Sequence, residues 1–183
     1  ASASRKPSKN TPALTSFRDT IAILLLLLAC LSCQSRKPST PIERLQQQLH
    51  DDSVSLCAIQ QKYPDPIRNN FRWCDSMLQY LPEEEIDKCF PVLELSQAYL
   101  NQFDKLLPMM RHTLSYTQQQ LANLQNDIDT HYISDSLAAV YLKDETAVAD
   151  TLHHRILYFE DRLSTQDKEL KTLRKTISKA VSK

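Results

Sequence analysis

Residues 149–177 read ADTLHHRILYFEDRLSTQDKELKTLRKTI, and this stretch decides the fold. Its apolar side chains recur at alternating spacings of three and four residues, and they are Ala149, Leu152, Ile156, Phe159, Leu163, Leu170, Leu173 and Ile177. This alternation places them on one side of an α-helix, and its persistence over more than four heptads is typical of coiled-coil packing. Gln166 is the one polar residue that interrupts the stripe. We therefore expect a long helix over about 145–181.

A second long stripe precedes it and begins where Pro82 is followed by three glutamates. Acidic residues in a first turn complement the helix dipole, so they favour a helix start at this point. The apolar members of the stripe are Leu93, Leu100, Phe103, Leu107, Met110, Leu114, Leu121, Leu124 and Ile128. Pro91 and Pro108 lie inside it, and we expect a kink or a short break at each. The pattern predicts a helix over about 82–131.

Two shorter stripes come first in the chain. One begins after Pro41, a residue suited to the first turn of a helix, and ends at Pro64. The other stops at Pro82. Their apolar members are Ile42, Leu45, Leu49, Leu56, Ile59 and Tyr63 in the first, and Ile67, Phe71, Cys74, Leu78 and Leu81 in the second. We expect two short helices, over about 42–63 and 67–81.

The four stripes together predict an all-α fold. A single amphipathic helix is marginal in water, because most helical stability comes from burying the apolar face. The linker over about 132–147, with a short helix over 137–142 capped by Ser134 or Ser136, is long enough to reverse the chain. We therefore expect an elongated bundle, built on a long antiparallel coiled-coil-like hairpin whose base is covered on one face by the two short helices.

In this hairpin we expect Leu114 to Ile128 to face Ala149 to Leu163. The alternative is a parallel homodimer or homotrimer through the last stripe. The spacing of apolar residues does not separate the hairpin from the oligomer.

The composition supports helices and excludes several functions. The chain has 183 residues and no glycine. Without glycine, tight hairpin turns and Schellman caps become scarce, and the glycine-rich loops that cradle phosphate groups are missing. The formal net charge is zero, and removing residues 1–33 takes away four basic residues and one acidic residue, which leaves −3. The chain therefore lacks the overall excess of basic residues that is typical of nucleic-acid-binding proteins.

The N-terminal segment has the layout of a signal peptide. Residues 1–20 are polar and basic, and Ile21 to Ala29 is an unbroken apolar run. A helix needs about 20 apolar residues to span a bilayer, and this run is too short. We expect residues 1–29 to be a signal peptide. The alternative is a short uncleaved anchor or a buried core helix.

The residues Leu27-Leu28-Ala29-Cys30 resemble the lipobox of bacterial lipoprotein precursors. The resemblance implies that Cys30 receives a lipid and that residues 30–41 form the lipidated cysteine and its tether before a helical domain over 42–183. Cys33 is the alternative, although its −3 position is a cysteine. A lipid anchor implies attachment to a membrane in the bacterial envelope, facing the periplasm. Neither cysteine is followed by Asp, the residue that in that family favours retention in the inner membrane, so the resemblance implies the outer membrane.

Three further cysteines follow the tether, namely Cys57, Cys74 and Cys89. In an oxidising compartment a disulfide between Cys57 and Cys74, or between Cys74 and Cys89, would join antiparallel helices across a proline turn. Three small residues that pack in the core are an equally good interpretation. No CxxC pair indicates a metal site or a reactive thiol.

No arrangement of residues indicates catalysis. The five histidines form no HExxH motif, and His153-His154 are adjacent, so their rings diverge on a helix. His50-Asp51-Asp52 would touch a metal ion weakly at best, and a solvated helix face is the better interpretation. We expect no catalytic residue, no metal and no cofactor.

The last 16 residues carry a local charge of +5 from Lys168, Lys171, Arg174, Lys175, Lys179 and Lys183 against one glutamate. A solvated face suited to a helix C-terminus is one interpretation. Contact with anionic envelope material, such as lipid head groups, cell-wall polymer or an acidic partner, is the other. The final residue of the given sequence is Lys183, and in this it is similar to the peptidoglycan-linked major outer-membrane lipoprotein, which likewise ends in lysine. The resemblance implies a cell-wall contact.

The leading hypothesis is a non-enzymatic envelope lipoprotein that acts as a structural spacer or interaction protein through its helical hairpin. It implies a lipid anchor, a protein partner in the envelope and no nucleic acid, while homo-oligomers remain open. The alternative is a periplasmic chaperone or accessory module that holds client proteins between its helices. The chaperone requires apolar side chains exposed on the inner face of the hairpin, whereas the spacer requires a sealed stripe.

Overall fold

The computed structural model describes residues 40–182, so Cys30, Cys33 and Lys183 lie outside the described residues, as does the predicted signal peptide. The chain divides into two compact units, residues 1–37 and 38–183, and the described residues belong to the second. They form five helical elements and no strand, which confirms the all-α fold. The elements are α2 (Pro41–Lys62), α3 (Pro64–Met77), the 3₁₀ helix η1 (Leu78–Tyr80), α4 (Glu83–Asp129) and α5 (Asp135–Val181).

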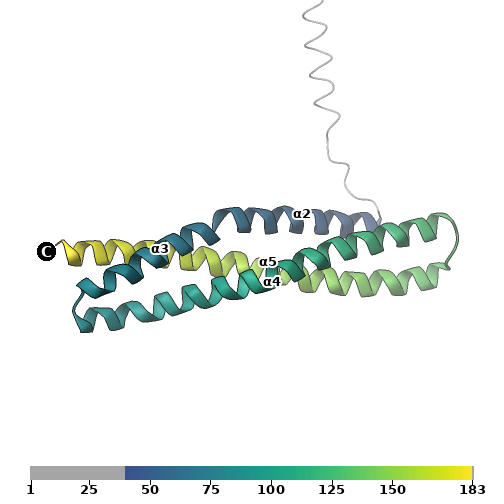
Figure 1. The fold of residues 1–183 in the computed structure, drawn as a ribbon. Coiled ribbons are helices and arrows are strands. Elements are labelled where there is room, and N and C mark those ends of the chain that lie inside the picture. Colours follow the sequence, from purple (N-terminus) through teal and green to yellow (C-terminus); the bar gives the residue numbers. More distant parts are fainter. Residues whose placement is uncertain (1–39, 183) are drawn as a thin grey trace, which may run out of the picture. The chain divides into compact units, whose positions relative to one another are not determined.

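Helices α4 and α5 form an antiparallel pair within one chain, as predicted for the hairpin, and α2 and α3 lie along it end to end (Figure 1). The first two helices run antiparallel to α4 and parallel to α5. Ile42 packs with Leu124 and Ala138 near the hairpin turn, while Cys74 joins the core at the other end. The short helices therefore cover almost the whole hairpin, and not its base alone as the sequence predicted.

Helix α5 begins ten residues earlier than predicted. Ser134 caps it by accepting a hydrogen bond from the backbone N–H of Leu137, and the predicted short helix over 137–142 is its first part. No residue breaks the helix before Ala149, so the linker shrinks to residues 130–134. The shorter linker shifts the pairing: Leu124 lies beside Ala138, so the predicted facing of Leu114–Ile128 with Ala149–Leu163 is wrong.

The hairpin turn is a Schellman cap made without glycine. The N–H of Tyr132 bonds to the carbonyl of Asp127, and the N–H of His131 bonds to that of Ile128. His131 has φ of 55°, in the left-handed region that usually requires glycine. A motif that the composition made unexpected is therefore present, at the expense of a strained residue.

Proline acts differently inside α4 and at the start of α3. Helix α4 runs through Pro91 and Pro108 without the predicted breaks. Both prolines are exposed, so the carbonyl that each deprives of a partner has access to water. Pro64, in contrast, ends α2 and opens α3, three residues before the predicted start.

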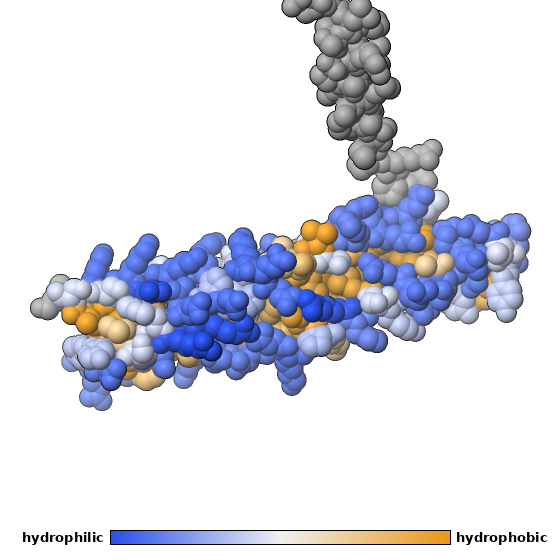
Figure 2. Space-filling model, turned by 45° about the horizontal axis from the view of Figure 1, so that its top comes forward, coloured by the Kyte–Doolittle hydropathy of each residue, from blue (hydrophilic) through white to orange (hydrophobic). Residues whose placement is uncertain are grey.

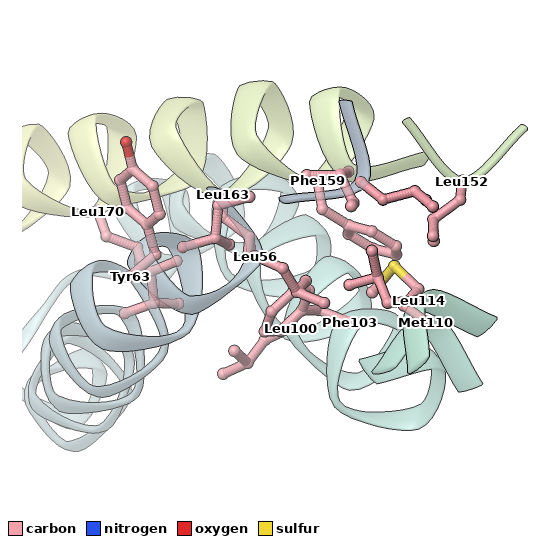
Figure 3. Close-up of a cluster of buried hydrophobic side chains, with 14 of the residues drawn as sticks. Leu56, Tyr63, Leu100, Phe103, Met110, Leu114, Leu152, Phe159, Leu163 and Leu170 are labelled. Atoms are coloured by element: carbon pink, nitrogen blue, oxygen red, sulfur yellow. The ribbon is translucent and has the colours of Figure 1, made fainter. Parts of the chain in front are cut away.

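The core consists of the predicted stripes, packed inward along the whole bundle. Figure 3 shows side chains from α2, α4 and α5 meeting around Phe103 and Phe159, whose rings lie 5.3 Å apart edge to face. The face drawn in Figure 2 is mostly hydrophilic, with apolar side chains gathered at the middle and at one end. The bundle is thus a coiled-coil-like rod of three helical strands. Helices α4 and α5 are two of them, and α2 and α3 together form the first strand, which is broken between Lys62 and Pro64.

Candidate functional site

The predicted basic patch lies at the C-terminal end of α5. Lys168, Lys175 and Lys179 are exposed, and no ion pair involves them within the described residues. Lys171 is partly neutralised, because its Nζ lies 2.6 Å from Oδ2 of Asp167. The structure thus brings these four lysines onto the outward part of one helix.

Arg174, the fifth described member of the patch, turns toward α3. Its guanidinium donates to Oδ1 of Asn70 at 3.0 Å and lies over the ring of Trp73, 4.7 Å from the centroid. Both contacts join α5 to α3, so Arg174 fastens the bundle and is less available to a partner.

The three described cysteines are all free thiols. Cys57 is exposed on α2, whereas Cys74 and Cys89 are buried in the core. Burial raises the pKa of Cys74 to about 11, and burial likewise raises the pKa of Cys89. Both buried thiols therefore stay protonated near neutral pH and pack as small apolar residues.

A buried polar contact at Asp52 was missed by the sequence analysis. Asp52 is 3% exposed, and its Oδ1 lies 2.6 Å from Nδ1 of His153 on α5. Because a carboxylate only accepts, the ring nitrogen is the donor. The solvated face expected for His50-Asp51-Asp52 is wrong for Asp52. The signal was present, since Asp52 occupies the stripe position between Leu49 and Leu56.

A second polar contact fills the gap that Gln166 leaves in the α5 stripe. Ser96 of α4 donates a hydrogen bond of 2.9 Å to Oε1 of Gln166, and both side chains are buried. Thr117 is also buried, and its hydroxyl has no partner within the described residues. Polar groups at core positions fix the alignment of neighbouring helices, because a shifted register would leave them unpaired.

The sides of the hairpin that α2 and α3 cover carry several polar contacts between helices. Arg68 pairs with Asp104 at 2.6 Å, Gln60 accepts from Arg111, and Gln48 donates to Asp150. These contacts tie the first strand to both long helices along its length.

The outer side of the hairpin, away from α2 and α3, is different. We call it the open seam and define it by the side chains that precede core positions of α4 and α5, namely Leu95, Tyr99, Leu106, Met109, Tyr116, Tyr141, Val148, Arg155, Tyr158 and Arg162. Tyr99 and Tyr158 meet edge to face at 6.4 Å between ring centroids. The guanidinium of Arg162 lies 5.8 and 5.5 Å from those two centroids.

Two further features of residues 40–182 bear on function. No three side chains of His, Cys, Asp or Glu in this range are placed to hold a metal ion together. In the same range, no helix combines the length and the apolar character that a membrane span requires.

Comparisons with protein-family models, with curated proteins and with solved structures found no match to this chain. The arrangement of its own residues is therefore the basis on which a function can be proposed.

Proposed function

We propose that the chain is a non-enzymatic, lipid-anchored lipoprotein of the bacterial envelope that acts as a rigid spacer or interaction protein. The observation that carries the proposal is the sealed core. All three strands of the bundle turn their apolar stripes inward, and α4 alone has 47 residues, which corresponds to about 70 Å of helix. A continuous core of this length resists bending, which is the property that a spacer needs.

The positions of the two ends support a spacer. The first strand begins at Pro41, beside the hairpin turn, and the exposed lysines lie at the opposite end of α5. From Ala138 to Lys179 the helix rises by about 60 Å. A lipid on Cys30, or on Cys33, would hold the turn end, and the lysines would meet anionic envelope material at the far end.

The chaperone alternative has less support. It requires apolar side chains on the inner face of the hairpin that are free to hold a client. In the described residues that face is occupied by α2 and α3, whose Leu49, Leu56 and Ile67 pack against α4 and α5. A client would have to displace the entire first strand.

The anchor is tested by replacing Cys30 and Cys33 together with serine and following the incorporation of [³H]palmitate in the bacterium. We expect labelling to be lost in the double variant and kept when Cys57 is replaced instead, because Cys57 lies on the bundle surface. Labelling that persists in the double variant would overturn the lipoprotein proposal.

The partner of the lysine end is tested by pull-down with the full chain in detergent, using purified cell-wall sacculi as the probe. Lys168→Glu/Lys175→Glu should reduce retention several-fold, because each exchange replaces attraction to an anionic polymer with repulsion. Lys105→Glu/Lys143→Glu, which changes two exposed lysines elsewhere, is the matched control. Equal retention of the two double variants would remove the lysine end from the proposal.

A further inference from the structure

The open seam is an apolar strip that no helix covers in the described residues. Tyr116 is 56% exposed and Tyr141 is 47% exposed, and Leu95, Met109, Val148 and Tyr158 are also exposed. From Leu95 to Tyr116 and from Val148 to Arg162, the residues that precede core positions include no Lys, Asp or Glu. Their only charged groups are Arg155 and Arg162. Tyr, Met and Arg are enriched in protein interfaces, and Lys, Glu and Asp are depleted there.

The seam is also hollowed near both ends. One groove of about 160 Å³ lies between Gln120 and Asp127 of α4 and Tyr141 and Glu145 of α5. Another, of about 380 Å³, lies just beyond the far end of the seam, where Val92 of α4 faces Lys168, Glu169 and Leu173 of α5. Grooves between two helices receive the ridges of a third, so the seam is shaped for helical packing.

Charge along the seam is divided between its two parts. At the turn end, Asp144 and Glu145 lie between the seam residues Tyr141 and Val148, and we include them in the seam from here on; neither makes an ion pair in the described residues. Burial, and then the charge of Asp144, raises the pKa of Glu145. Farther along α5, the seam positions carry Arg155 and Arg162, and Nε of Arg162 lies 3.9 Å from Oδ2 of the neighbouring Asp161, which is outside the seam. The seam therefore has an acidic part and a basic part on one surface.

We propose that the open seam binds the open seam of a second copy of this chain in an antiparallel two-fold dimer. A surface with an acidic and a basic part is complementary to itself only when the copies run in opposite directions, because a parallel pair would place like charges together. With the axis near Met109, Arg162 of each copy faces Asp144 and Glu145 of the other. Tyr158 then lies over Val148 of the other copy.

The overlap is large enough for a dimer. The stretch from Tyr141 to Thr165 is about 36 Å long, and two neighbouring helices are about 20 Å wide. The contact would thus cover about 700 Å² on each copy, close to the roughly 800 Å² per partner of a standard interface. Lys168 and Lys175, which test the lysine end, lie beyond Thr165 and so outside this contact, and the dimer therefore does not depend on the proposed function of the lysine end.

The first test is the molecular mass of the full chain in detergent, measured by sedimentation at micromolar concentrations. We expect the mass of two chains. Met109→Ser/Tyr158→Ser should weaken dimerisation by about tenfold or more, since both side chains lie at the centre of the contact. Val54→Ser/Leu157→Ser, two exposed apolar residues outside the seam, should leave it unchanged. A monomeric wild-type chain, or equal effects of the two double variants, would overturn the proposal.

The second test addresses the antiparallel direction. Arg162→Glu and Glu145→Arg should each weaken the dimer several-fold, and combining them should restore it, because the exchanged charges again face each other. The two residues are about 25 Å apart on one helix, so restoration cannot come from within a chain. A double variant that is as weak as the single variants would exclude this arrangement.

Discussion

The two sides of the α4–α5 hairpin are built from different side chains, although the same helices form both. Where α2 and α3 pack, the flanking positions carry polar and charged groups that pair across helices, such as Arg68 with Asp104 and Asp52 with His153. On the open seam the corresponding positions carry tyrosines, Leu95, Met109 and two arginines. Polar pairs fix the register of a helix that is already present, whereas an uncovered apolar strip raises the question of a further partner.

The sharpest test of this difference compares neighbours in the sequence. Phe159 is 0% exposed in the core, and Tyr158 is 39% exposed on the open seam. Phe159→Ala should lower the free energy of unfolding by about 3–5 kcal/mol, because it opens a cavity between three strands. Tyr158→Ala should lower it by about 1 kcal/mol or less. Chemical denaturation at low protein concentration, followed by circular dichroism, measures both, and equal losses would contradict the boundary drawn here between core and seam.

A smaller effect is expected where the covered side places a carboxylate in the core. Asp52→Leu should raise the free energy of unfolding by about 1–2 kcal/mol, since leucine completes the α2 stripe and removes a buried charge. His153 is partly exposed and can bond to water when its partner is lost. Asp51→Leu, on the exposed neighbour, is the control and should change little. A loss of stability in Asp52→Leu would mean that the contact with His153 outweighs the penalty of burial.

The effects of substituting Ser96 and Gln166 on stability should be strongly coupled. The change in the free energy of unfolding should be smaller than for Asp52→Leu. Ser96→Ala leaves the buried Oε1 of Gln166 without its donor and should cost about 1 kcal/mol. Adding Gln166→Leu removes the unpaired group and restores the apolar stripe, so the double variant should be at least as stable as the wild type. A double-mutant cycle by denaturation measures the coupling, and additive losses would show that the two side chains act independently.

The smallest effect concerns the thiols and appears only in alkali. Cys74 has a pKa raised from 9.0 to about 11, so the folded chain resists ionisation that the unfolded chain undergoes from about pH 9. Its contribution to stability is complete below pH 9 and declines as the pH rises toward 11. Cys74→Ala should flatten that decline relative to the wild type, whereas Cys57→Ala, at an exposed site, should not. Identical pH profiles for the three proteins would contradict the effect of burial.

Much of the fold follows from apolar spacing, because each stripe had to be buried against another. The register of α4 against α5 did not follow from the apolar spacing, since it depends on where α5 begins. The linker was predicted over about 132–147, but Glu145 merely takes the stripe position between Leu142 and Ala149 within one continuous helix. Helix continuity requires only that nothing breaks the backbone, and no proline or glycine lies there.

The polar core contacts and the open seam were harder to find from sequence. Gln166 was recognised as an interruption of its stripe, but its partner Ser96 lies 70 residues away and is named only by the structure. Asp52 fits the stripe by spacing, and its charge led to the wrong assignment. The seam side chains look like ordinary exposed residues until α4 and α5 are placed side by side. The predicted lipid anchor rests on residues outside the described range and remains a prediction.

The contacts within the hairpin and the contacts of the first strand differ in sequence separation, and this difference has a consequence for the order of folding. Five residues join α4 to α5, whereas Asp52 and His153 are separated by 101 positions. Bringing together ends that are twenty times farther apart costs about 2.6 kcal/mol more in chain entropy. The hairpin can therefore close from local contacts, while residues 41–77, which are synthesised before α4 and α5, must wait for the last helix before they can dock against it.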